Sequence, residues 1–312
     1  MTVVVTPPQD GALRRVSDVL IARPGLLLML LLTPPLLWLG VVYLGALFAL
    51  LAQSFFSIDE FSGTIVYQPT LATYAELLAP ANLDIIVRTL VVAAVVTVLA
   101  ALVAFPIAYY AARYARGKVK ALFYLAVMMP LWSSYLVKVY AWKLLLAKEG
   151  AVTWLVQAAG LTKILDLWLA APLVGGPSLS VSYTGMVLTF LYLWTPFMIL
   201  PLQASLERVP ATLIEASDDL GAAPRQTFRH VILPLAAPGL IAGAIFTFSL
   251  TLGDYIVPQI VGPSSLILGQ AVYAEQGNAG NVPLAAAFCV APIAIMFVFL
   301  ALARRTGALD AL

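Results

Sequence analysis

The sequence has few of the residues on which most catalytic and metal sites depend. Its 312 residues include one cysteine, Cys289, and one histidine, His230. A single cysteine excludes an intrachain disulfide and any site built from several thiolates. A single histidine removes most zinc and catalytic-triad chemistries. We therefore expect no catalytic residue and no metal site in this chain.

Charged residues are scarce as well. They make up 10% of the chain, whereas an ordinary soluble domain carries roughly a quarter. Hydrophobic residues make up 62%, and the mean hydropathy is +0.98. Seventeen basic and fifteen acidic residues cannot cover the surface of a soluble protein of this size. A net charge of +2 also gives no basic stripe for nucleic acid. The composition indicates an integral membrane protein.

Six apolar stretches are long enough to cross a bilayer, which takes about 20 helical residues. They run over residues 26–53, 85–112, 121–146, 183–206, 235–257 and 284–303. The first is too long for a signal peptide and lacks a cleavage site, so we expect it to remain as an anchor. The pattern predicts an all-α, polytopic protein with one transmembrane domain over 26–303. Residues 1–25 precede this domain, and 304–312 form a tail.

The basic residues predict the orientation. Twelve of the seventeen lie in segments that share one side of the membrane if six spans alternate: Arg14, Arg15, Arg23, Arg113, Arg116, Lys118, Lys120, Arg208, Arg225, Arg229, Arg304 and Arg305. The positive-inside rule places this side, and both termini, in the cytoplasm. Segments 54–84, 147–182 and 258–283 then lie outside, with a short helix expected at 71–78. We expect a multi-pass membrane protein.

The cytoplasmic segment between the fourth and fifth spans, residues 207–234, has well-placed prolines and a glycine. Pro210 fits a first helical turn, and Gly221 fits the left-handed position that ends a helix. Pro224 then begins a second helix, which Pro234 is expected to stop. The segment therefore predicts two short helices joined by an elbow. Such an elbow suits a helix-in-groove contact with a cytoplasmic partner.

This segment resembles the EAA loop of permease subunits in binding-protein-dependent ABC importers. The family pattern is Glu-Ala-Ala, three residues, Gly, nine residues, Ile-x-Leu-Pro. Here, Ser217 replaces the second alanine and Val231 replaces the isoleucine. The resemblance implies the type I ABC importer permease fold, with a coupling helix that docks on a nucleotide-binding subunit. The residues that it assigns to coupling are Glu215, Ala216, Ser217, Asp219, Gly221, Val231, Leu233 and Pro234.

Two further stretches are similar to spermidine/putrescine-type permeases. They are residues 129–142, with Met-Pro-Leu-Trp-Ser-Ser-Tyr followed by Tyr-Ala-Trp, and residues 252–258, with Leu-Gly-Asp-Tyr-Ile-Val-Pro. The resemblance implies import of a polyamine. Other small organic solutes of the same subfamily, such as amino-phosphonates or opines, remain an alternative.

The resemblance also implies the location, a bacterial inner membrane, and the partners. The partners are two nucleotide-binding subunits that bind ATP and Mg, a second and related permease subunit, and an extracytoplasmic solute-binding protein. The chain itself carries no Gly-x-x-x-x-Gly-Lys-Ser/Thr loop, so we expect it to bind no cofactor and to be a non-catalytic subunit.

Asp254 lies near the outer end of the fifth span, where an ionisable group usually faces a cavity or a partner. Thr247, Thr251 and Asp254 fall at helical spacing on one face. This face either lines the translocation path, with Asp254 attracting an amino group, or places Asp254 at the interface as a local backbone cap. Three aromatic residues are suited to contact a polyamine and complete the candidate path: Tyr135, Trp194 and Tyr255.

Other function classes fit the sequence less well. An ion-coupled secondary transporter would be expected to show paired intramembrane acids or broken helices in matched halves, and Asp254 has no obvious mate. An intramembrane enzyme would need a Ser/His, Cys/His or paired-carboxylate set within the spans. A purely structural subunit would leave the strict spacing of the elbow unexplained.

Overall fold

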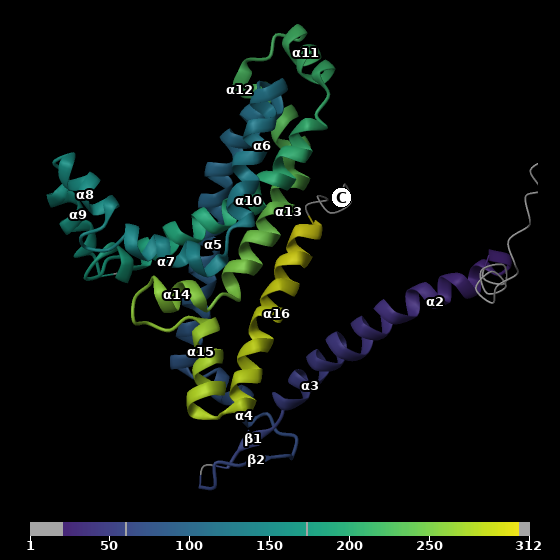
Figure 1. The fold of residues 1–312 in the computed structure, drawn as a ribbon, viewed down its shortest axis with the longest axis vertical. Helices are drawn as coiled ribbons and strands as arrows, with labels where there is room; N and C mark the ends of the chain where they lie inside the picture. The colour runs from purple at the N-terminus through teal and green to yellow at the C-terminus, as the bar shows by residue number, and fades with distance from the viewer. Residues whose placement is uncertain (1–20, 60, 173, 306–312) are drawn as a thin grey trace, which may run out of the picture. The chain divides into compact units, whose positions relative to one another are not determined.

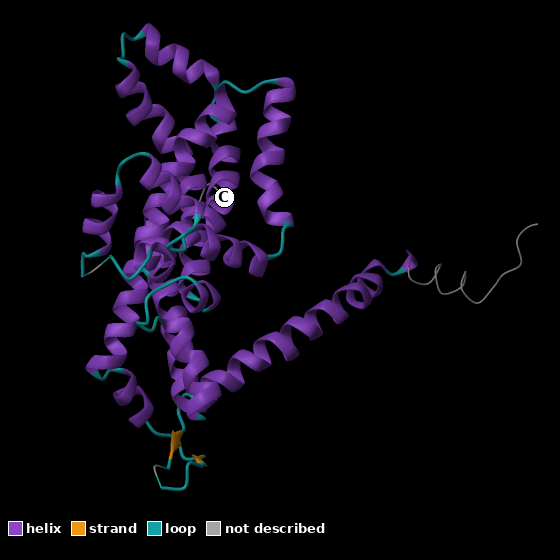
Figure 2. Ribbon diagram, turned by 60° about the vertical axis from the view of Figure 1, so that its left-hand side comes forward, coloured by secondary structure: helices purple, strands orange, loops and turns teal. Residues whose placement is uncertain are grey.

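The computed structural model describes residues 21–59, 61–172 and 174–305. Its contacts divide the chain into one unit that ends at Gln53 and another that begins at Ser54. Almost all regular structure is helical, as Figure 2 shows. The exception in the described chain is a short antiparallel pair, β1 (Ser57–Ile58) with β2 (Ile65–Val66). The all-α prediction is confirmed.

The described part of the first unit is mostly helix, continuous from Pro24 to Gln53. This run consists of α2 (Pro24–Leu37), the π-helical η1 (Trp38–Leu44) and α3 (Gly45–Gln53). Pro24 occupies the first turn, where a missing N–H breaks no bond. Pro34 and Pro35 lie inside α2, and η1 follows them, so the backbone bonding pattern changes where prolines interrupt it. The run is long and apolar enough to span a membrane.

The second unit is centred on three helices that pack against one another: α5 (Pro80–Arg113), α10 (Tyr183–Glu207) and α13 (Leu233–Leu252). On α5, part of the contact face is a row of fully buried alanines four residues apart, Ala100, Ala104 and Ala108. They pack with Met198 and Leu202 of α10. Small residues matter here because lipid is as apolar as a helix surface, so close van der Waals packing holds membrane helices together.

Two glycines bring α13 even closer to α10. A Cβ atom on Gly239 would lie 2.4 Å from the Pro201 carbonyl oxygen and 2.5 Å from Ser205 Cβ. One on Gly243 would lie 3.0 Å from the Met198 Cα. These glycines are four residues apart, the spacing that allows two membrane helices to approach backbone to backbone.

The third span is broken, so the prediction of one helix over 121–146 is wrong. Helices α6 (Gly117–Trp132) and α7 (Tyr135–Leu145) meet at a 96° bend. Pro130 has no N–H to bond the backbone one turn earlier, which weakens α6 two residues before its end. The Pro130 carbonyl accepts hydrogen bonds from Ser133 Oγ at 2.9 Å and from Lys138 Nζ at 2.8 Å. Side chains therefore satisfy a carbonyl that a continuous helix would bond through its backbone.

The fifth span begins earlier and ends earlier than predicted. The short helix α12 (Pro224–Thr227) continues through the π-helical η3 (Phe228–Ile232) into α13. Pro234 therefore does not stop the second elbow helix, which is a correction. It falls where the bonding register changes from π to α, so its missing N–H interrupts no regular ladder. The span ends at Leu252, before the expected 257, and α14 (Ile256–Ile260) follows after a turn.

The sixth span is α16 (Val282–Arg305). In the described chain, five helices are long and apolar enough to cross a membrane, and there are six candidate spans if the bent pair α6 and α7 counts as one. In the second unit, the elbow lies at one end and the β pair with α4 at the other (Figure 1). The remaining short elements are α4 (Ala72–Leu77), α8 (Ala151–Ala158), α9 (Thr162–Leu169), η2 (Leu179–Val181), α11 (Ala211–Asp219), α15 (Leu268–Ala274) and η4 (Glu275–Ala279).

The close contact of α13 with α10 gives a stability prediction. Gly239→Ala places a methyl group against backbone and should lower the free energy of unfolding by about 1–3 kcal/mol. The matched control is Gly253→Ala, whose Cβ would lie 3.8 Å from the Ser249 carbonyl oxygen, an ordinary contact. Thermal unfolding of the purified protein, followed by tryptophan fluorescence, measures both. Equal midpoints for the two variants would contradict the packing argument.

Candidate functional site

The elbow has the backbone geometry that its glycine predicts. Gly221 has a φ of +75°, the left-handed conformation. Its N–H donates to the Asp218 carbonyl at 2.8 Å, and the N–H of Ala222 donates to the Ser217 carbonyl at 3.1 Å. This pair of bonds is the Schellman arrangement that closes a helix. Pro210 lies at the N-cap of α11, one residue before the first turn in which it was expected.

A hydrogen bond joins the two helices of the elbow. Ser217 Oγ of α11 lies 2.9 Å from Thr227 Oγ1 of α12, and Thr227 is buried. The Gln226 side chain also accepts a bond from the Ala223 N–H at 2.8 Å, which fixes the start of α12. Ser217 is one of the two departures from the family pattern. The structure gives this departure a role, because an alanine could not make the contact.

The outer surface of the elbow is acidic and apolar. Glu215, Ala216 and Asp219 are exposed, and Leu220 is 88% exposed. Neither carboxylate forms an ion pair within the described part of the chain. An exposed leucine beside exposed acids offers a partner both an apolar and a charged contact, so this face suits a complementary groove.

The other predicted coupling residues lie elsewhere. Val231 is in η3, and Leu233 and Pro234 open α13, at the point where the elbow joins the fifth span. Between them, Ile232 is 3% exposed and packs in the core with residues of α5 and α10. These positions connect the elbow to the bundle and do not form its exposed face.

A second cluster gathers three of the predicted path residues. Asp254 lies in the turn between α13 and α14, and its Oδ1 accepts a hydrogen bond from the Val257 N–H at 2.9 Å. Its Oδ2 accepts a hydrogen bond from the Tyr135 hydroxyl. The Tyr135 ring stacks on Trp194, with centroids 6.0 Å apart and planes at 16°. Residues from α7, α10 and the turn after α13 therefore meet at one place, which we call the outer acidic cluster.

The break in the third span makes this cluster possible. Tyr135 is the first residue of α7, so the 96° bend determines where its ring lies. The cluster agrees in part with both interpretations of Asp254. The carboxylate caps local backbone, as the second expects, and it lies among the aromatic residues that the first assigns to a path. Lys138, which bonds the Pro130 carbonyl at the break, is a structural residue that the sequence did not reveal.

The remaining predicted path residues are placed differently. Thr247 and Thr251 are buried, with 0% and 1% exposure, and Thr251 Oγ1 donates back to the Thr247 carbonyl at 2.8 Å. Thr247 Oγ1 and Trp194 Nε1 are buried without a hydrogen-bond partner among the described residues. Tyr255 stacks on Tyr273 of α15, with centroids 5.5 Å apart. The threonine stripe therefore lies inside this subunit in the structure described.

Comparison with known proteins identifies the class. A family model described as "Binding-protein-dependent transport system inner membrane component" matches residues 104–306. The chain is 54% identical over 312 residues to the inner membrane ABC transporter permease protein YdcU of Escherichia coli K12, covering 100% of this chain and 99% of that one. It is 28% identical over 243 residues to the spermidine/putrescine transport system permease protein PotB of the same organism, covering 77% and 83%.

Solved structures show the same fold. The crystal structure of a bacterial ABC transporter involved in the import of the acidic polysaccharide alginate matches with a TM-score of 0.66 at 15% identity, covering 93% of this chain and 99% of that one. The chain belongs to the family of binding-protein-dependent transport system inner membrane components. It is an ABC importer permease of the inner membrane, and the predicted permease fold is confirmed.

The outer acidic cluster gives a prediction about α7. Tyr135→Phe keeps the ring stack on Trp194 but removes a hydrogen bond to a carboxylate, a class of bond worth about 1.5–3 kcal/mol. Amide hydrogen exchange over residues 135–145 should therefore become at least several-fold faster. Tyr140→Phe on the same helix is the control, because the Tyr140 hydroxyl forms no hydrogen bond with described residues. Equal protection in both variants would show that the Tyr135 contact does not hold α7.

Proposed function

We propose that this permease imports a polyamine of the spermidine/putrescine type into the cytoplasm. The observation that carries the proposal is the outer acidic cluster. It combines the Asp254 carboxylate with the aromatic rings of Tyr135 and Trp194. A carboxylate attracts an ammonium group, and aromatic faces favour both cations and methylene chains. The similarity to PotB, whose printed name includes spermidine and putrescine, supports the same class of solute.

The elbow is the proposed site of energy coupling. Two nucleotide-binding subunits hydrolyse ATP with Mg, and their closure pushes on the exposed face at Glu215, Ala216 and Asp219. The permease domain, paired with a second and related permease chain, then rocks between outward-facing and inward-facing states. An extracytoplasmic solute-binding protein delivers the cargo. A similar solved structure holds an alginate-loaded periplasmic protein in its complex, which supports this kind of partner.

Amino-phosphonates and opines are the alternative solutes. An amino-phosphonate carries an anionic group that a carboxylate would repel, so the outer acidic cluster favours a polyamine over it. An ion-coupled mechanism is a more distant alternative. The broken third span is one feature of such transporters, but they are expected to show it in matched halves, and the described chain has one such break.

Substitutions in the elbow test the coupling. Glu215→Arg reverses the charge of the docking face, and Gly221→Val places a β-branched residue at a φ of +75°. Each should reduce uptake per ATP hydrolysed by roughly 5- to 150-fold, the factor that corresponds to a typical coupling free energy. Membrane insertion should persist. The measurement is transport and ATPase activity of the reconstituted complex.

The matched control for the charge reversal is Glu149→Arg, in an exposed position of an outer segment. It should leave the ratio of uptake to hydrolysis unchanged. If all three variants transported like the unmodified protein, the elbow would not be the coupling site.

A substitution at Asp254 tests the solute. Asp254→Asn keeps the size and one acceptor oxygen of the side chain but removes the charge. It should lower the uptake of labelled putrescine by about tenfold, equivalent to ~1.4 kcal/mol. Glu149→Gln removes an exposed acid elsewhere on the outer side and should have little effect. Unchanged putrescine uptake by Asp254→Asn would remove Asp254 from the path.

A further inference from the structure

The connection from α10 to the elbow is held by α6. Glu207, the last residue of α10, accepts a hydrogen bond from the Tyr124 hydroxyl at 2.9 Å and one from the Gln203 amide at 3.2 Å. The same oxygen, Oε1, lies 2.9 Å from Lys120 Nζ. Lys120 and Tyr124 are one turn apart on α6. Three donors from two helices therefore converge on one carboxylate at the end of α10, where the elbow begins.

A second contact comes from α5. Arg113, the last residue of α5, donates through a terminal guanidinium nitrogen to the Val209 carbonyl at 3.0 Å. Val209 is 4% exposed and directly precedes Pro210, the N-cap of α11. Residues 207–210, which lead from α10 into the elbow, are thus bonded to α5 and α6 through side chains.

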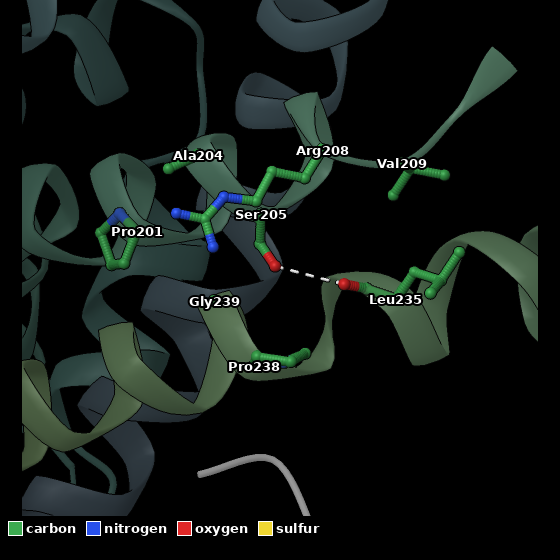
Figure 3. Close-up of a pocket in the computed structure, with 8 residues that line it drawn as sticks. All are labelled: Pro201, Ala204, Ser205, Arg208, Val209, Leu235, Pro238 and Gly239. Carbon is green, nitrogen blue, oxygen red and sulfur yellow. Dashed lines mark hydrogen bonds between the residues drawn. The ribbon is translucent and has the colours of Figure 1, made fainter. Parts of the chain in front are cut away.

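The segment that leads from the elbow into α13 is held differently. It runs from α12 through the π-helical η3 into α13 and forms no ion pair among the described residues. Apolar contacts hold it instead: Ile232 lies in the core, and the Phe228 ring packs edge-on against Phe105 of α5 with centroids 5.3 Å apart. A pocket of about 300 Å³ lies beside the contact between the end of α10 and the start of α13, which approach each other closely at Gly239 (Figure 3). Its lining includes Pro201, Arg208 and Pro238. One hydrogen bond crosses it, from Ser205 Oγ to the Leu235 carbonyl at 3.2 Å.

We propose that Glu207, Lys120, Tyr124, Arg113 and Val209 form a cytoplasmic clamp that makes α5, α6 and α10 move as one body with the elbow. These are positioning residues, because they act through α11. The inference deepens the proposed coupling function and rests on it.

The ion pair and hydrogen bonds of the clamp give it a mechanical role, because a push on α11 is passed through them to α5, α6 and α10. Without the clamp, α11 can pivot about the short connection at residues 208–210. ATP is then hydrolysed with little movement at the outer acidic cluster.

Charge reversal with rescue tests the clamp. Lys120→Glu or Glu207→Lys alone brings like charges together, and each should lower putrescine uptake per ATP at least fivefold. The double variant K120E/E207K restores opposite charges. The Tyr124 hydroxyl and the Gln203 amide can accept as well as donate, so the double variant should recover at least half of the lost coupling.

Lys118→Glu is the matched control, since Lys118 is exposed on the same helix and forms no ion pair with described residues. It should couple normally. A double variant no better than the single ones, or an equal loss in Lys118→Glu, would overturn the clamp.

A second measurement does not depend on the identity of the solute. In a Cys289→Ala background, spin labels at Lys118→Cys and Asp218→Cys report the distance from α6 to α11 in the complete reconstituted complex. With an intact clamp, the distance distribution should stay the same on addition of ATP and vanadate. With Glu207→Ala added, it should broaden or shift. The same distribution with and without Glu207→Ala would overturn the proposal.

If Glu215→Arg and Gly221→Val leave coupling intact, the proposed function of the elbow fails. If those variants uncouple the complex but Lys120→Glu and Glu207→Lys do not, only the clamp fails.

Discussion

The close packing of α5, α10 and α13 is the constraint on which the rest of the structure depends. In a bilayer, helices gain little from hiding apolar surface from each other, so contact has to come from small residues and near-backbone approach. The buried alanines of α5 and the glycines at 239 and 243 supply that approach. Because the three helices are held closely, groups at opposite ends of the bundle belong to one mechanical unit.

This packing links the two candidate sites. Helix α10 carries Trp194 of the outer acidic cluster and ends at Glu207, where the elbow begins. Helix α13 follows from the other side of the elbow and ends just before Asp254. The elbow therefore lies between two helices that both contribute to the outer acidic cluster, α10 from its middle and α13 through the turn after its last residue. A movement of one helix against the other at the elbow changes the distance between the aromatic rings and the carboxylate.

Much of this arrangement could be predicted from the sequence. Apolar run lengths located the spans, and Gly221 and Pro224 marked the elbow because few other residues suit those backbone positions. The break at Ser133 and Ser134 was missed, since the run of apolar residues continues through it and Pro130 alone does not determine a bend. Pro234 was misread for the opposite reason: a π-helical turn accommodates a proline that would stop a regular helix.

Sequence patterns could not predict which distant side chains pair. No periodicity places Tyr135 beside Asp254, or Lys120 beside Glu207, because those contacts depend on the bend and on helix packing.

The most direct test of the account compares proteoliposomes that contain the permease pair with and without its nucleotide-hydrolysing subunits. The account predicts solute uptake only when those subunits and ATP are present. Uptake by the permease pair alone, driven by an ion gradient, would contradict it.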